Sequence, residues 1–188
     1  MNILRFLGLE EKAASVPAAE TETIRKITDA LDHLDPERAK FIAGFAYILG
    51  RVARADMKIS PEETRSMERL VMERGDLPEE QAIIVIQMAK TQNVLFGSTE
   101  NFLVTREFSR IATREQKLAL LDCLFAVSAA DKSVTVLEDN EISQIVNELK
   151  LEHPDLIAAR SRFREYLAVL KKPPIDAASS FDGQRHRR

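Results

Sequence analysis

The sequence has no tryptophan, 2 tyrosines, 1 cysteine, 6 glycines and 7 prolines among its 188 residues. So few aromatic and turn-forming residues disfavour a β-sandwich or β-barrel, because both need aromatic-rich strands and many tight turns. The single cysteine, Cys123, excludes an intramolecular disulfide and fits a reducing compartment. It lies in the apolar run 118–127 with no histidine nearby in sequence. We therefore predict a buried core thiol rather than a nucleophile.

The chain also lacks a surplus of positive charge. Its 27 Lys and Arg residues against 30 Asp and Glu residues give a net charge of −3, whereas non-specific nucleic-acid binding needs an excess of basic side chains on one face. We expect no nucleic-acid partner. Residues 1–9 are apolar but too short for an export signal or a membrane span, so we expect a cytoplasmic protein. Those residues either pack on the domain itself or contact a membrane surface or a partner.

What the chain does contain is a succession of helical patterns. Apolar residues recur at helical spacing, and capping signals such as Asp35-Pro36-Glu37 and Thr113-Arg114-Glu115-Gln116 mark helix starts. These patterns predict an all-α helical bundle of about eight helices, with the helix that begins at Pro36 at its centre. The expected division is an N-terminal segment and linker (1–19), a helical domain (20–172) and a disordered tail (173–188). The last helix is expected to follow His153-Pro154 and to reach Leu170.

An internal repeat organises this helical domain. Residues 53–63 recur without a gap as residues 128–138, so that Asp56 matches Asp131 (131 − 56 = 75) and Glu63 matches Glu138 (138 − 63 = 75). Apolar residues on both sides match at the same offset. Each copy predicts an apolar helix, an Asp, a short loop, a Glu and a second apolar helix. We therefore expect two pseudo-repeated helix-loop-helix halves related by a rotation near two-fold.

Two explanations of these four acids remain open. Each Glu stands three residues after a Ser or Thr at a helix start, where a capping box requires it. Each Asp stands at the C-terminal end of a helix, where it costs about 0.3–1 kcal/mol against the helix dipole, unless its side chain caps the loop that follows. The functional alternative is a Ca²⁺ or Mg²⁺ site of four converging carboxylates. The cations of Arg51, Arg54, Lys58 and Lys132 could neutralise the same cluster without metal.

The segment Ala53-Arg-Ala-Asp-Met-Lys-Ile-Ser-Pro-Glu-Glu63 resembles the Ala-Asp-Gly-x-Ile-x-x-x-Glu signature of the tellurite-resistance TerB-like family, which includes the N-terminal region of DjlA-type DnaJ co-chaperones. The resemblance covers roughly residues 36–170. It implies an all-helical domain of two related halves with an acidic site for a divalent cation, formed by Asp56, Glu63, Asp131 and Glu138. The glycine that follows each Asp in the signature is Met57 in one copy and Lys132 in the other, which predicts a loss of backbone freedom there.

Catalytic motifs are absent from the sequence. The three histidines, His33, His153 and His186, lie far apart in sequence, and no phosphate-binding loop, nucleophile elbow or HExxH motif is present. We therefore predict a non-catalytic interaction or stress-response domain with a protein partner and no cofactor other than a possible divalent cation. The alternative is a metal-dependent hydrolase that uses the same carboxylates. A hydrolase needs open metal positions and a base in a cleft, whereas an interaction domain needs an exposed apolar patch.

Overall fold

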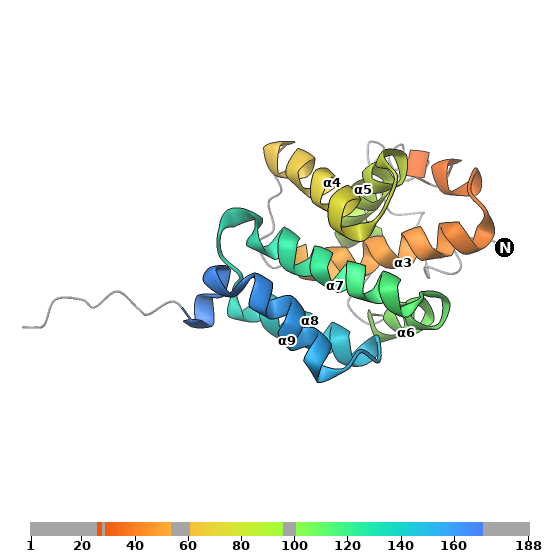
Figure 1. Ribbon diagram of the computed structural model, residues 1–188. Helices are drawn as coiled ribbons and strands as arrows, with labels where there is room; N and C mark the ends of the chain where they lie inside the picture. The colour runs from red at the N-terminus through yellow and green to blue at the C-terminus, as the bar shows by residue number, and fades with distance from the viewer. Residues whose placement is uncertain (1–25, 28, 54–60, 96–100, 171–188) are drawn as a thin grey trace, which may run out of the picture.

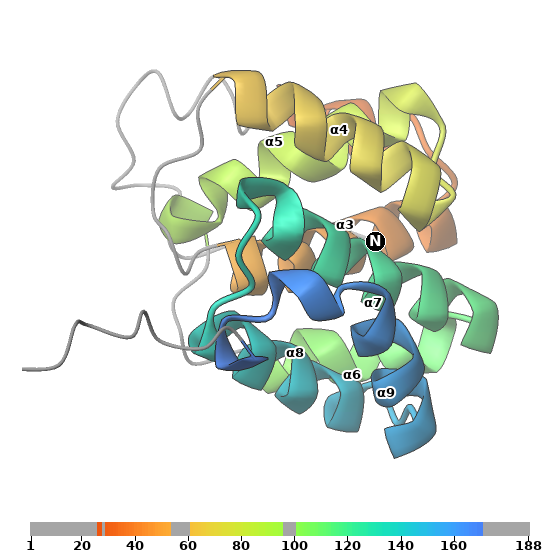
Figure 2. The ribbon, with the colours of Figure 1, turned by 60° about the vertical axis from the view of Figure 1, so that its left-hand side comes forward.

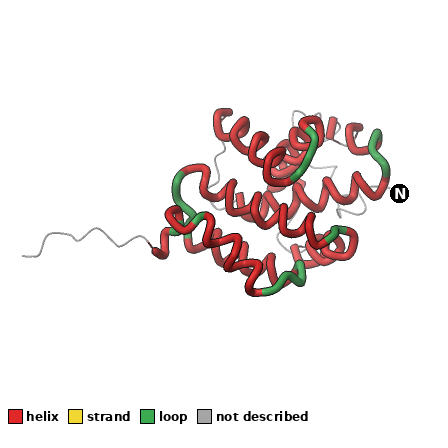
Figure 3. Tube along the Cα trace, in the orientation of Figure 1, coloured by secondary structure: helices red, strands yellow, loops and turns green. Residues whose placement is uncertain are grey.

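The computed structural model describes residues 26–27, 29–53, 61–95 and 101–170. Within these ranges every regular element is a helix (Figure 1; Figure 3), and β-structure is limited to an isolated parallel bridge between Val134 and Leu167. The all-α prediction is confirmed. Residues 26–27 and 29–32 are helical and precede α3 (Pro36–Ala53), α4 (Pro61–Gly75), α5 (Glu79–Leu95), α6 (Asn101–Ile111), α7 (Arg114–Ser128), η4 (Ala129–Asp131), α8 (Val136–Glu148), α9 (His153–Arg162), η5 (Arg164–Tyr166) and η6 (Ala168–Leu170). The predicted segment 1–19 and the predicted tail 173–188 lie outside the described residues.

Helix α3 runs through the middle of the bundle, with α4 and α5 on one side and α6 and α8 on the other (Figure 1). Its start follows from Asp35, whose Oδ1 accepts hydrogen bonds from the backbone N–H groups of Glu37 at 2.9 Å and Arg38 at 3.3 Å. Pro36 occupies the first helical position, where no donor is needed. Every residue from 41 to 52 is buried, which confirms the prediction of a central, buried helix.

Two glycines allow neighbouring helices to approach closely. A Cβ atom on Gly44 of α3 would lie 2.8 Å from Cδ2 of Phe108 on α6, and one on Gly75 of α4 would lie 2.8 Å from Cζ of Phe45 on α3. Helix α4 ends at Gly75. The left-handed residue that follows is Asp76, however, with φ of 53°. Gly75 is therefore required for the space it leaves to Phe45 rather than for its backbone freedom.

The helix boundaries of the two repeated halves follow the same offset as their sequences. Helix α3 ends at Ala53 and α7 at Ser128 (128 − 53 = 75), while α4 begins at Pro61 and α8 at Val136 (136 − 61 = 75). Both copies thus have a helix before the Asp and a second helix that carries the Glu. The near two-fold relation between the halves stays a prediction.

The C-terminal part of the domain departs from the expected long helix. Helix α9 ends at Arg162, and the two short 3-10 helices η5 and η6 follow it. Between them Leu167 is extended (φ −67°, ψ 114°), because the backbone there bonds to the loop before α8. Val134 N–H donates to the carbonyl of Tyr166 at 2.7 Å, and Ala168 N–H donates to the carbonyl of Val134 at 2.9 Å. A tertiary contact therefore ends a helix that the periodic apolar residues predict to continue.

Cys123 has the predicted position in the core. Its side chain is fully buried in α7, and burial, with a smaller contribution from the charge of Asp122, raises the pKa of the thiol to about 12. The thiolate that a nucleophile requires is therefore absent at neutral pH.

Candidate functional site

The second acidic loop connects α7 to α8. Helix α7 passes directly into η4, which ends at Asp131, and the next residue, Lys132, is left-handed with φ of 69° and ψ of 19°. The TerB-like signature has glycine at this position, and glycine adopts this conformation without steric cost. Lys132 therefore adopts, as a non-glycine residue, a left-handed conformation that costs about 1–2 kcal/mol.

Glu138, at the far end of this loop, is part of the capping box of α8. Its Oε2 accepts hydrogen bonds from the backbone N–H and from the hydroxyl of Thr135, both at 2.8 Å, and its own N–H donates to Thr135 Oγ1 at 3.2 Å. The residue is 5% exposed. The capping explanation of this glutamate is confirmed. A cation at Glu138 would have to share Oε2 with Thr135 or take the other carboxylate oxygen.

Of the other three predicted ligands, the structure describes at most the backbone. Asp56 lies outside the described residues. Glu63 is the third residue of α4 and Asp131 the last of η4, but their side chains lie outside the described part of the structure. Among the described residues, no group of three or more His, Cys, Asp and Glu side chains is arranged to hold a metal ion. The structure therefore places the backbone of three ligand candidates and the side chain of Glu138.

The second acidic loop contacts, through η4, the helix that follows the first acidic loop in sequence. The 3-10 helix η4, which ends at Asp131, contacts α4, which begins at Pro61 and carries Glu63 (Figure 2). Helix α4 also packs along α7. Asp131 therefore lies on an element that contacts the helix carrying Glu63.

Arg51 stands close to the acidic residues in sequence, but its side chain contacts α6 and α8. It lies in the last turn of α3, and its side chain is 2% exposed. Its Nε donates to Glu141 Oε1 at 2.8 Å and its Nη1 to Glu148 Oε2 at 2.6 Å, both on α8. Nη1 also donates to Thr105 Oγ1 on α6 at 2.7 Å. The expectation that Arg51 neutralises the acidic loops is wrong, because its guanidinium joins α3 to α6 and α8.

The energetics of this network follow from burial and charge acting in opposite directions. Burial acts to lower the pKa of Arg51, but the hydrogen bonds and charges of Glu148 and Glu141 outweigh it and raise that pKa above its ordinary value. Burial likewise acts to raise the pKa of Glu148, but Arg51, with Gln144 and Thr105, holds it below its ordinary value. Both groups are therefore ionised in the folded protein at neutral pH. The sequence offered no signal for this network, since its members are separated by 54 to 97 residues.

A second ion pair ties α8 to α9. Asp139, directly after Glu138, is buried and accepts a hydrogen bond from Arg160 Nη2. Desolvation raises the pKa of Asp139 and outweighs the opposite effect of the Arg160 charge. Within the described residues, neither Oδ1 of Asp139 nor Nε of Arg160 has a hydrogen-bond partner. This pair connects the start of α8 to the helix that leads into the C-terminal segment.

Three comparisons with known proteins bear on this architecture. Residues 41–161 match the family model described as tellurite resistance protein TerB. Neither the curated proteins nor the solved structures gave a match, so the resemblance to DjlA-type co-chaperones stays a prediction. Among the described helices, none has both the length and the apolar composition of a membrane span.

Proposed function

Because the chain belongs to the TerB family of tellurite-resistance proteins, we propose that it acts as a non-catalytic, cytoplasmic interaction domain whose two acidic loops hold one divalent cation, Ca²⁺ or Mg²⁺. The proposed ligands are Asp56, Glu63, Asp131 and Glu138. Carboxylate oxygens are the ligands that these hard cations prefer.

The observation that carries the proposal is the contact between η4 and α4. It brings Asp131 and Glu63 onto neighbouring elements. Two carboxylates about 4 Å apart repel each other by roughly 4 kcal/mol at an effective dielectric constant near 20, so acids that converge there need a counter-ion. Arg51 is not this counter-ion, because its guanidinium is paired with Glu148 and Glu141. A bound cation would neutralise the converging carboxylates instead.

The capping role of Glu138 is compatible with a ligand role. A carboxylate has two oxygens and about four acceptor sites, and the box with Thr135 holds the carboxylate at the edge of the loop. The capping box would thus orient the ligand as it starts the helix. This is the arrangement in which a second partner fixes a metal-binding side chain.

The hydrolase alternative gains no support from the described residues. His33 is exposed with its Nδ1 2.6 Å from the carbonyl oxygen of Asp29, and His153 is exposed at the first position of α9. Neither lies on the loop 131–138. His186 lies outside the described residues. The described part of loop 131–138 therefore contributes no histidine of its own as a base for a metal-bound water.

The test is a thermal-unfolding titration of the full chain, stripped of metal with a chelator, against Ca²⁺, Mg²⁺ and Mn²⁺. A cation bound only by the folded state stabilises it by RT ln(1 + [L]/Kd), which is about 2.7 kcal/mol at one hundred times Kd. Asp56→Asn and Asp131→Asn should each remove most of this gain, because each keeps the side-chain shape and loses the charge. Isothermal calorimetry should show the same loss of binding heat.

Two variants separate binding from helix capping and from general charge. Thr113→Ala breaks the capping box of α7, at the opposite end of that helix from Asp131, at a cost of about 1 kcal/mol, and it keeps every carboxylate, so the cation response should persist. Asp76→Asn removes an exposed acid at a left-handed position that Asn also tolerates, and should leave the response unchanged. If the wild-type chain shows neither heat nor a melting shift with millimolar cation, the cation site does not exist.

A further inference from the structure

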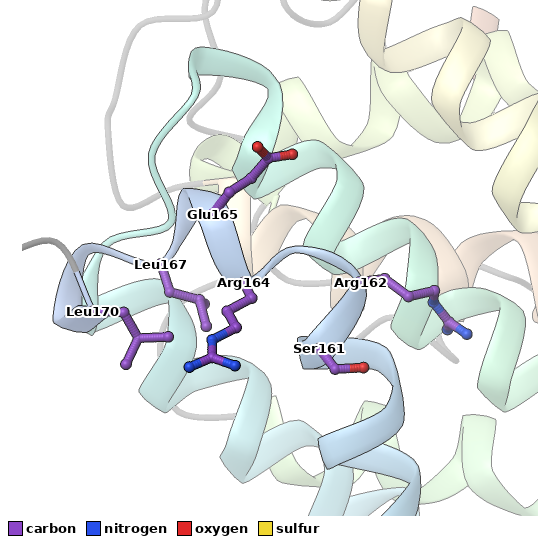
Figure 4. A pocket seen from close by; sticks show the side chains of 6 residues that line it. All are labelled: Ser161, Arg162, Arg164, Glu165, Leu167 and Leu170. Atoms are coloured by element: carbon purple, nitrogen blue, oxygen red, sulfur yellow. The ribbon is translucent and has the colours of Figure 1, made fainter.

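The C-terminal segment of the domain forms a hollow of mixed apolar and basic character, which we call the arginine groove. It has a volume of about 430 Å³ and is lined by Ile157, Arg160, Ser161, Arg164, Leu167 and Leu170. An adjoining hollow of about 570 Å³ shares Ser161, Arg164, Leu167 and Leu170 with it, and Figure 4 shows the side chains around this second hollow. Both volumes lie in the range of ligand-binding hollows in proteins, about 300–1,000 Å³.

The apolar part of the groove is exposed at its rim. Ile157 of α9 is 54% exposed and Leu170 of η6 is 52% exposed, whereas Leu167 between them is buried. Covering such side chains with a partner removes their remaining apolar surface from water, which favours binding. Exposed apolar side chains around a hollow are therefore a favourable place for another molecule to bind.

The charge of the groove is positive. Arg164 has no ion pair with any described residue and is exposed. The nearby Arg160 is already paired with Asp139, and Arg162 with Asp122 at 2.7 Å. Glu165 lines the adjoining hollow but not the groove, and its side chain points away from that of Arg164 (Figure 4). The charge that remains without compensation in the groove is the guanidinium of Arg164.

The groove is held in its shape by contacts from the rest of the domain. The hydrogen bonds of Val134 with Tyr166 and Ala168 fix the backbone of η5 and η6. The ring of Phe163 stacks on Phe125 of α7, with centroids 5.9 Å apart. A binding site whose backbone is already ordered loses less conformational entropy when a partner binds.

The residues that follow Leu170 do not fit the groove by charge. Residues 171–188 contain five Lys and Arg and two Asp, a net charge of +3 (5 − 2 = 3). A basic segment against Arg164 would place like charges together, which is unfavourable. An acidic segment would instead form a charge-assisted bond with the guanidinium.

We propose that the arginine groove binds an acidic amphipathic helix of a protein partner, which places a leucine or isoleucine between Ile157 and Leu170 and an Asp or Glu against Arg164. An amphipathic helix suits an open hollow with an apolar floor, because residues at i, i+3, i+4 and i+7 present one apolar face. This rests on the proposed interaction role, whose partner it specifies by chemistry, and does not depend on the cation site.

The test uses a fluorescein-labelled helical peptide of about 14 residues, with leucines on one face and glutamates beside them. A matched peptide carries Gln in place of every Glu. Fluorescence anisotropy with the full chain should show the acidic peptide binding at least about ten-fold more tightly than the Gln peptide, and this difference should shrink in 1 M salt, where the Debye length falls to about 3 Å. Arg164→Glu and Ile157→Ser should each weaken binding of the acidic peptide about ten-fold or more.

Two variants on α6 serve as matched controls. Arg110→Glu reverses another exposed arginine, whose side chain is 72% exposed, and Leu103→Ser removes another leucine that is 51% exposed. Both should bind the acidic peptide like the wild type. The cation response of the Arg164→Glu variant should also equal that of the wild type, so that failure of the groove and failure of the cation site are distinguished.

Several results would overturn the proposal. They are the absence of binding of the acidic peptide at millimolar concentration, equal binding of the Gln peptide, and an equal loss in the Arg110→Glu control. Binding of phosphatidylglycerol vesicles but not of the peptide, lost in Arg164→Glu, would make the groove a membrane contact instead. A dimer of the wild type that Arg164→Glu dissociates, measured by analytical ultracentrifugation, would make a second copy the occupant.

Discussion

The buried network around Arg51 allows a quantitative test of the fold. The change Arg51→Met keeps much of the apolar volume of the side chain and removes the charge, so Glu148, whose side chain is 7% exposed, loses its buried cation. Removing one partner of a buried ion pair costs about 3–5 kcal/mol. For a domain of this size each kcal/mol lowers the melting midpoint by about 2–4 °C. The expected decrease is therefore on the order of 6–20 °C.

The double variant Arg51→Met with Glu148→Met tests whether this cost comes from the orphaned charge. Replacing both members of a buried pair by apolar residues of similar volume is often close to neutral, so the double variant should recover most of the stability lost by Arg51→Met. Glu141→Gln is the matched control, because its side chain is 31% exposed and Arg51 keeps its bonds with Glu148, so this variant should lose less stability than Arg51→Met. Urea unfolding measures all of these differences.

The pH dependence of stability should reverse between wild type and Arg51→Met. In the wild type the pKa of Glu148 is lowered, so its contribution is present above the unfolded value of about 4.3 and is lost as the pH falls through the folded value. Without Arg51, burial raises that pKa, so the variant should gain stability as the pH falls from 7 towards 5. A loss below about 1 kcal/mol in Arg51→Met, or a double variant no more stable than the single one, would refute the reasoning.

Two further predictions concern single residues. Lys132→Gly should stabilise the protein by up to about 1 kcal/mol in urea unfolding. The left-handed conformation costs a non-glycine residue about 1–2 kcal/mol, and the greater conformational entropy that glycine gives the unfolded chain offsets about 0.4–1 kcal/mol of the gain. Lys132→Ala keeps the positive φ of 69° and should show no gain, so equal stability of the two variants would contradict the explanation. Cys123 should resist alkylation by iodoacetamide at pH 8 in the folded protein, because burial raises the pKa of its thiol to about 12, and should react once urea unfolds the chain; rapid reaction under native conditions would contradict its position in the core.

Local interactions made much of the helical architecture predictable. Asp35 and the capping boxes of Thr113 and Thr135 mark helix starts that the structure confirms, because these signals involve residues two or three positions apart in the chain. The central position of α3 was predictable for a related reason, since apolar and small residues cover most of its surface from 41 to 52 and such a helix is buried on every side.

The sequence therefore determined the helices, their caps and the candidate acidic ligands, because each depends on neighbours along the chain. Only the tertiary structure decided which charged groups meet. It paired Arg51 with Glu148 on α8, 97 residues away, and bonded Val134 to the segment around Leu167, which ended α9 and formed the arginine groove. Partners so distant in sequence leave no periodic signal, because their approach depends on how whole helices pack and on the free energy of burying charge between them.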